Sequence, residues 1–172
     1  MKCSLIFLTY VLFSLLYPGK SLAQSRDAMQ KLRFLEGQWK GAAEAILGPG
    51  KKVNMVQTEN VQMKLNDRVL LIEGTGREQG QVVFQALAVA AYDSLNRKYT
   101  MKAFRDNGQS TDAYLDVKGE NWLEWGFNTE RGKIRYTIRL NSKGQWHEVG
   151  EFSPNGGETW YKSFEMTLDK LK

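Results

Sequence analysis

Turn signals recur along this chain at short and nearly even intervals, and they constrain the fold more than any other feature. From residue 39 onward, apolar and polar side chains alternate in runs that Gly, Asn and Asp residues interrupt. The connections are too short to hold crossover helices, so neighbouring strands are expected to pair as antiparallel hairpins. The pattern predicts ten strands, at residues 39–47, 52–64, 68–78, 81–93, 97–106, 110–118, 120–128, 131–141, 144–152 and 157–169.

An open sheet of these strands would expose unpaired backbone groups along two edges, whereas a closed sheet exposes none. The sequence therefore predicts an all-β fold, a ten-stranded antiparallel up-and-down β-barrel, with a two-sheet sandwich as the alternative. A short N-terminal helix is expected to precede the barrel, capped by Ser25 and ending at Gly37. Its apolar face would carry Ala28, Met29, Leu32 and Leu35.

The strand predicted at 81–93 is apolar on both faces and so needs cover on both. The N-terminal helix is the expected outer cover, and a partner subunit is another, which leaves a homo-oligomer open. The even-numbered face of the 81–93 strand carries Ala86, Ala88 and Ala90. Small side chains on an inward face leave volume inside a barrel, where a ligand can lie.

Residues 1–23 are typical of a secretory signal peptide. Lys2 precedes an apolar run from Leu5 to Leu16, and Ser21-Leu22-Ala23 offers a small-x-small cleavage site. The run is shorter than the roughly 20 residues that span a bilayer, so no stable membrane insertion is expected after cleavage. We expect one domain at 24–172, periplasmic or secreted; an uncleaved membrane anchor is the alternative.

The net charge of +5 is spread along the chain without a basic block, which argues against nucleic-acid binding. The only cysteine, Cys3, lies within the predicted signal peptide. The mature chain is therefore expected to have no disulfide and to depend on its hydrophobic core for stability.

The stretch Phe34-Leu35-x-Gly37-x-Trp39-x-Gly41 resembles the Gly-x-Trp signature of the calycin superfamily, which includes the lipocalins. Later blocks resemble the bacterial DUF1579 family, whose function is unknown: Tyr92-Asp93, Tyr99, Phe104-Arg105-Asp106-Asn107-Gly108, Trp146-x-Glu148-x-Gly150, Gly157-x-x-Trp160 and Glu165-Met166-x-Leu168. The resemblance covers about residues 30–171. It implies a barrel with an internal cavity and implies no activity.

Nitrobindin-like members of the superfamily bind haem through a histidine near the C-terminus. The single histidine here, His147, lies beside Trp146 in a different local setting, and alternation with Trp146 and Glu148 predicts that it points outward. No haem ligand is carried over, and no cofactor is expected.

Two sets of side chains are candidates for the cavity. The resemblance implies that Trp39 closes the base of the barrel and that an arginine stacks on it, with Arg139 preferred over Arg135. Glu59 and Glu73 fall on adjacent strands, where position 59 pairs with about 74, so they are expected to be near neighbours; two inward carboxyls would raise one pKa. The remaining candidates for ligand contact are Arg105, Trp125, Trp146, Glu148 and Trp160.

Each candidate also has a simpler interpretation: the aromatic residues would form an ordinary core, and the glutamates would lie in solvent at the rim. No zinc-protease, phosphate-loop, nucleophile-elbow or calcium-loop motif is present, and Gly74-x-Gly76 indicates a bulge or hairpin end. The leading hypothesis is an exported protein that binds a small apolar or amphipathic molecule and catalyses no reaction. An enzyme acting on such a molecule and a structural module of the cell envelope are the alternatives.

Overall fold

The computed structural model describes residues 18–48 and 50–172, with side chains from residue 23 onward. A helix, α2 (Pro18–Gln30), and a 3-10 turn (Arg33–Leu35) precede ten strands. The strands are β1 (Gly37–Gly48), β2 (Lys51–Lys64), β3 (Val69–Glu78), β4 (Gln81–Asp93), β5 (Lys98–Arg105), β6 (Ser110–Gly119), β7 (Trp122–Thr129), β8 (Gly132–Leu140), β9 (Trp146–Ser153) and β10 (Tyr161–Lys170).

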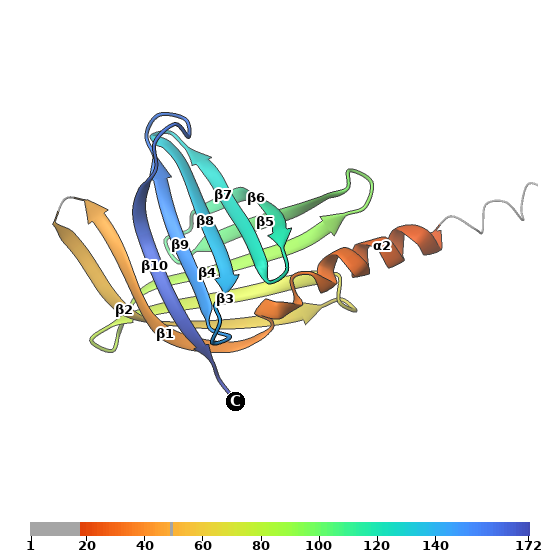
Figure 1. Cartoon of the computed structure of the whole chain (residues 1–172), viewed down its shortest axis with the longest axis horizontal. Helices are drawn as coiled ribbons and strands as arrows, with labels where there is room; N and C mark the ends of the chain where they lie inside the picture. The colour runs from red at the N-terminus through yellow and green to blue at the C-terminus, as the bar shows by residue number, and fades with distance from the viewer. Residues whose placement is uncertain (1–17, 49) are drawn as a thin grey trace, which may run out of the picture.

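The strands form one closed antiparallel barrel in which each strand pairs with its neighbours in the chain (Figure 1). The last strand pairs with the first, from Trp39 opposite Lys170 to Ala45 opposite Phe164. The predicted all-β, up-and-down barrel is therefore confirmed, and the two-sheet sandwich is excluded. The strand limits differ from the expected ones by a few residues, most at β10. That strand begins at Tyr161 because Gly156 and Gly157 adopt positive φ angles of 75° and 109° and continue the turn.

The barrel has two different ends. At one end lie the hairpin turns that join β1 to β2, β3 to β4, β5 to β6, β7 to β8 and β9 to β10; we call this end the mouth. At the other end the N-terminal segment reaches the barrel, and α2 lies beside the β4–β5 side of it (Figure 1).

The N-terminal helix differs from the prediction. Within the described residues it runs from Pro18 to Gln30, so Ser25 lies inside the helix and does not cap it. The Ser25 hydroxyl instead faces the backbone oxygen of Tyr92, at 3.5 Å. Tyr99 fixes the same helix from β5, because its hydroxyl donates to the Ala28 carbonyl at 2.7 Å. Of the predicted signal peptide, residues 1–17 lie outside the described residues and 18–23 form the start of α2.

The helix does not cover the outer face of β4, contrary to expectation. Met29, Leu32 and Leu35 are fully buried and join the inward-facing Leu70 and Ala90 in one core cluster. The helix and the turn after it therefore close the end of the barrel. The outer face of β4 stays partly in solvent, with Val83 45% exposed. No helix within the described residues is long and apolar enough to cross a membrane.

Trp39 closes the base of the barrel, as the signature implied, but its partners differ from those expected. Its indole N–H donates to the Leu35 carbonyl at 2.7 Å, and its ring meets Trp146 edge-on at 5.8 Å. The cation above the ring is Lys170, 5.2 Å from the ring centroid. The prediction of an arginine there is wrong, because Lys170 faces Trp39 directly across the β1–β10 pairing.

We expect Gly41→Ala to destabilise the barrel, because an added Cβ would lie 2.0 Å from the Thr167 carbonyl oxygen and 2.8 Å from Leu168 Cα. Both are backbone atoms of β10, so they can move only if the closing pair of strands separates. The free energy of unfolding in urea should fall by about 2–3 kcal/mol. In the control, Gly119→Ala, the new Cβ meets one Trp122 ring atom at 3.3 Å, and a much smaller loss is expected. Equal losses in the two variants would contradict this account.

Candidate functional site

The half of the barrel nearer the mouth is hollow. The cavity has a volume of about 380 Å³ and reaches solvent, since its wall includes Leu47, which is 60% exposed, and the exposed Arg105. Its walls are mainly apolar. They are formed by Ala45, Leu47, Met55, Gln57, Glu59, Ile72, Gly74, Phe84, Ala86, Ala88, Met101, Ala103, Arg105, Trp125, Tyr136, Ile138, Trp146, Glu148, Ser163, Phe164 and Met166.

Small side chains explain why this half is empty. Ala86 and Ala88 face inward from β4 and Ala103 from β5, as the alanines of the 81–93 segment predicted. Toward the other end, larger inward residues such as Leu70, Leu123 and Leu168 fill the barrel and are fully buried. The interior is therefore a packed core at the end near α2 and a cavity at the end near the mouth.

One wall of the cavity is aromatic. Trp125 on β7 and Tyr136 on β8 stack with their ring centroids 4.2 Å apart and their planes 11° apart. Phe164 on β10 meets the Tyr136 ring edge-on at 6.1 Å. Strands β7 and β8 place Trp125 directly opposite Tyr136, so the sheet register itself creates the stack. Such a flat, rigid surface suits the apolar body of a ligand.

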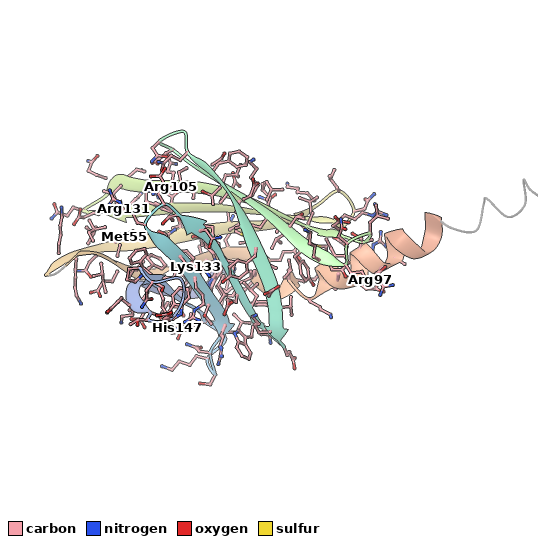
Figure 2. The ribbon with its side chains drawn as sticks, turned by 90° about the horizontal axis from the view of Figure 1, so that it is seen from above. Met55, Arg97, Arg105, Arg131, Lys133 and His147 are labelled. Atoms are coloured by element: carbon pink, nitrogen blue, oxygen red, sulfur yellow. The ribbon has the colours of Figure 1, made fainter. Side chains whose placement is uncertain are left out.

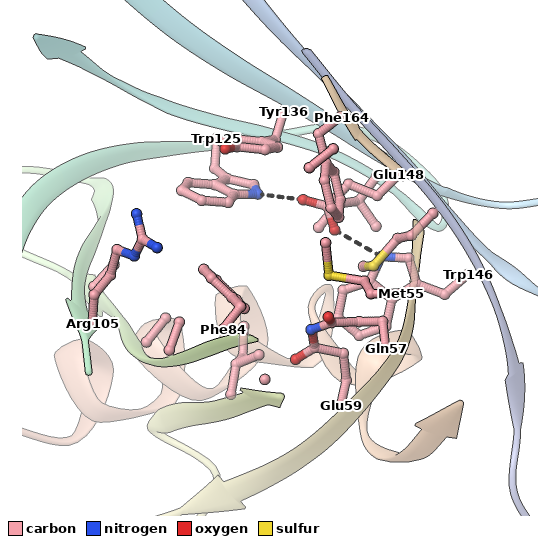
Figure 3. Close-up of a pocket in the computed structure, with 18 of the residues that line it drawn as sticks. Met55, Gln57, Glu59, Phe84, Arg105, Trp125, Tyr136, Trp146, Glu148 and Phe164 are labelled. Carbon is pink, nitrogen blue, oxygen red and sulfur yellow. Dashed lines mark hydrogen bonds between the residues drawn. The ribbon is translucent and has the colours of Figure 1, made fainter. Parts of the chain in front are cut away.

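Glu148 lies deep in the cavity and is held by two indole groups (Figure 3). Trp125 donates to one of its carboxyl oxygens and Trp146 to the other, each at 3.1 Å. Trp146 is two residues away on the same strand, and Trp125 comes from β7. Both Glu148 oxygens are therefore held in fixed positions, and the residue itself is only 5% exposed to solvent.

Glu59 forms the other deep polar group, together with Gln57 on the same strand. The Gln57 side-chain N–H donates to Glu59 Oε1 at 2.7 Å, and both side chains are buried. They lie against Gly74 on β3, where an added Cβ would stand 2.8 Å from Glu59 Oε1 and 3.2 Å from Gln57 Nε2. The Gly74-x-Gly76 pair thus makes room for two polar side chains, and the predicted bulge does occur next to it, between Gly76 and Arg77.

Burial raises the pKa of both carboxyl groups. Removal from water raises the pKa of Glu59 from 4.5 to about 7, although the Gln57 hydrogen bond partly offsets the effect. For Glu148, burial is again the main cause and the negative charge of Glu59 adds to it, so that its pKa rises to about 8 against the lowering effect of the two indole donors. The cavity therefore contains two acids that keep protons near neutral pH.

Arg105 is the cationic group at the mouth. Its guanidinium lies 5.0 Å from the centroid of the Phe84 ring, and among the described residues no carboxylate pairs with it. Figure 2 shows Arg105 toward the end of the barrel away from α2, while Arg97 lies beside the helix. A ligand entering the cavity would therefore pass a free guanidinium.

Five of the nine residues predicted for ligand contact line the cavity: Glu59, Arg105, Trp125, Trp146 and Glu148. Trp39 lies below them in the packed core. Arg139 stands outside, 3.8 Å above the Trp122 ring, and Trp160 lies outside beneath Arg135, at 4.0 Å. Arg135 also pairs with Glu151 across the outer wall at 2.7 Å. Trp160 precedes β10, so the inward–outward alternation of that strand does not apply to it, since the chain is still turning there.

The predicted Glu59–Glu73 pair is wrong. The expected register is right, because Glu59 lies opposite Gly74 and Glu73 opposite Asn60. Directly paired residues share a face of the sheet, however, so Glu73 points outward with Asn60, which donates to it at 3.0 Å. The acid that accompanies Glu59 is Glu148 on β9, which β1 and β10 separate from β2 in the barrel. His147 points outward as predicted and contacts Glu165 at 3.1 Å.

Three wall residues that give the cavity its character were not among the predicted ligand contacts: Met55, Gln57 and Phe84. Alternation from Glu59 would have identified Gln57 and Met55. Nothing in the sequence indicates that Glu59 and Glu148 share a cavity, since that depends on the curvature of the closed sheet. Within the described residues, no three His, Cys, Asp or Glu side chains are grouped to hold a metal ion.

We expect the free energy of unfolding to fall as pH rises. An acid whose pKa is raised on folding stabilises the fold fully below its unfolded value, and that contribution is lost as pH rises through the folded value. The loss should therefore run from about pH 4.5 to about pH 8, at up to about 1.4 kcal/mol per pH unit for each carboxyl.

Urea unfolding of the wild type and of Glu148→Gln across pH 5–9 checks this, because the variant should show a shallower slope. Glu73→Gln, on the outer wall, should keep the wild-type slope. A stability that is flat or rises over this range in the wild type would refute the assignment.

The model of the family described as "Protein of unknown function (DUF1579)" matches residues 24–170. No curated protein matches the chain in sequence. Two similar solved structures share the fold at low identity. Rv2717c from M. tuberculosis is 10% identical, with a TM-score of 0.60 over 84% of this chain and 98% of that one. The S-type phycobiliprotein lyase CPES from Guillardia theta is 8% identical, with a TM-score of 0.58 over 90% and 99%. The matched signature, the closed barrel and the family model agree: the chain belongs to the DUF1579 family.

Proposed function

We propose that this barrel binds a small amphipathic molecule in its cavity. The observation that carries the proposal is the hollow of about 380 Å³ at the mouth end, directly above a fully packed core. A chain that needed only stability would gain by filling this space, because larger buried side chains would remove more apolar surface from water. Ligand sites in proteins are typically concave, mostly apolar and equipped with few polar groups, and this cavity has each of these properties.

The distribution of polar groups predicts how the ligand would be oriented in the cavity. The Trp125–Tyr136 stack and the aliphatic wall would hold an apolar body. Arg105 would meet a polar or anionic group at the mouth, since its guanidinium is unpaired among the described residues. The likeness to a phycobiliprotein lyase is one of fold and does not select the ligand.

A reaction on the bound molecule is the second candidate. It is favoured by Glu148, whose pKa of about 8 keeps it protonated at neutral pH inside a site that binds apolar groups. Such a group can act as a general acid.

The proposal includes export. Its support is the N-terminal sequence: Lys2, the apolar run from Leu5 to Leu16, and the small residues Ser21 and Ala23. The mature chain would begin at Gln24 and would keep Ser25 and Ala28, the helix residues that bond to the barrel.

Filling the cavity should abolish binding without unfolding the protein. In Ala86→Phe a ring would enter the hollow, whereas Val83→Phe places the same ring on the exposed outer face of the same strand. The probe is anilinonaphthalene sulfonate, an aromatic dye with an anionic group for Arg105. Its fluorescence should rise to saturation with the wild type and with Val83→Phe.

For Ala86→Phe, the dye affinity should fall by about tenfold or more, because the space for its rings is lost. Thermal unfolding should show both variants folded. An unsaturable signal in the wild type, or equal affinity in the two variants, would contradict the proposed function.

Export predicts a specific mass. Intact-mass measurement of the full-length chain, expressed with its own N-terminus in a bacterium and recovered from the extracytoplasmic fraction, should show the loss of residues 1–23. Ala23→Gln should block this cleavage, since a large side chain at that position does not suit the small-residue site. Full-length protein found only in the cytoplasm would count against export.

A further inference from the structure

The deep end of the cavity has an excess of hydrogen-bond acceptors. Three side chains supply them: Gln57 and Glu59 from β2 and Glu148 from β9. Three N–H hydrogen bonds are made to them within the protein, one from Gln57 to Glu59 and one from each of two indoles to Glu148. Gln57 Oε1 is buried and has no hydrogen-bond partner, and no described group donates to Glu59 Oε2.

These acceptors and the Glu148 carboxyl line the same part of the cavity. We name Gln57 Oε1, Glu59 Oε2 and the Glu148 carboxyl the floor acceptors. Figure 3 shows Glu148 and the Gln57–Glu59 pair on facing sides of the deep part of the cavity, with Met55 beside them. A buried acceptor without a donor is costly, so Gln57 Oε1 in particular favours a ligand that brings a donor. Carboxyl oxygens can each accept more than one hydrogen bond, so the indole donors do not saturate Glu148.

We propose that the ligand's buried end is an amine, which enters as an ammonium ion and donates its N–H groups to the floor acceptors. This inference rests on the proposed function and names the chemical class of the ligand: an amine on an apolar body. An ammonium group offers three donors and no acceptor, which matches carboxyl groups that become acceptors alone once they lose their protons. The matching body is unbranched or flat, because it must lie along the Trp125–Tyr136 stack.

The charges around the floor acceptors favour a cation. The titratable groups facing the cavity are Glu59 on β2, Glu148 on β9, Tyr136 on β8 and, at the mouth, Arg105 on β5. The tyrosine keeps its proton, with a pKa of about 12 caused mainly by burial. The other lining residues are uncharged. An ammonium ion at the floor would therefore meet two acids and lie apart from Arg105, which stands at the other end of the cavity (Figure 3).

Binding of an ammonium ion should expel protons. The raised pKa values of Glu59 and Glu148 keep these acids largely protonated near neutral pH. A bound cation favours the ionised carboxylate, so at least one acid must lose its proton to solvent as the complex forms. An alkylammonium ion, like a lysine side chain, stays charged up to about pH 10. The affinity should therefore rise with pH between 6 and 8 and level off above that range.

The experiment compares octylamine with octanol, two molecules with the same tail that differ in the end group. Titration calorimetry on the wild-type chain at pH 8 should show octylamine binding about tenfold tighter or more, the size expected for charged hydrogen bonds. Repeated at pH 7 in two buffers of different ionisation enthalpy, the titration should show release of roughly one proton per octylamine and none per octanol. This measurement needs no variant, so it does not depend on how a mutation affects folding.

Variants then test which residues cause the preference for octylamine. Glu59→Gln and Glu148→Gln should each reduce the preference for octylamine over octanol. Glu73→Gln, which changes a glutamate on the outer face of the strand paired with β2, should retain it. Equal affinity for the two molecules in the wild type, or amine binding without proton release, would overturn the amine assignment while the proposed function stood. If neither molecule binds and neither displaces anilinonaphthalene sulfonate, the proposed function itself fails.

Discussion

The pairing of β10 with β1 is the constraint on which the rest of the structure depends. Without it, two strands would present unpaired backbone groups to solvent, and the inner face of the sheet would have no interior to line. Gly41 permits this pairing, because the backbone of β10 occupies the place where a side chain would begin. Since closure fixes which side of every strand faces inward, it also selects the residues that meet in the cavity.

Closure also divides the interior into two parts with different physical roles. Around Trp39, large apolar side chains and the residues of α2 exclude water and supply the stabilising burial. Above Trp146, alanines replace them and two carboxyl groups enter the apolar space. Burial of an acid costs free energy unless it is neutral or hydrogen-bonded, and Glu148 is both at neutral pH. The unfilled acceptors beside it are tolerated because the packed half stabilises the fold.

The fold could be predicted because its signals are local. Turn residues and alternation mark each hairpin, and ten hairpin-linked strands leave closure as the way to remove both edges. The register of β2 and β3 also followed from the turn, but the inference about Glu73 failed, since two residues one step out of register point to opposite faces. The helix cap was assigned to Ser25 because serine is a common N-cap residue, but Ser25 lies inside α2.

The site could be predicted only in part, because its geometry depends on residues distant in sequence. Glu59 and Glu148 are brought together by the curvature of a closed sheet, and no spacing rule encodes that curvature. The partner of Trp39 illustrates the same limit. An arginine was expected on a late strand, but the strand that closes the barrel ends in Lys170, which therefore lies over the ring. The aromatic residues were identified as candidates without any means of separating inner from outer ones, and Trp160 proved to be outer.

The placement of α2 has a further consequence. The helix seals one end, while the cavity meets solvent at the opposite end, where the wall includes Leu47 and Arg105. A ligand in the cavity could therefore enter and leave without breaking any contact made by Met29, Leu32 or Trp39. If the cavity binds a ligand as proposed, separate groups of residues would set the rate of ligand exchange and the lifetime of the folded chain, so evolution could alter ligand release without destabilising the barrel.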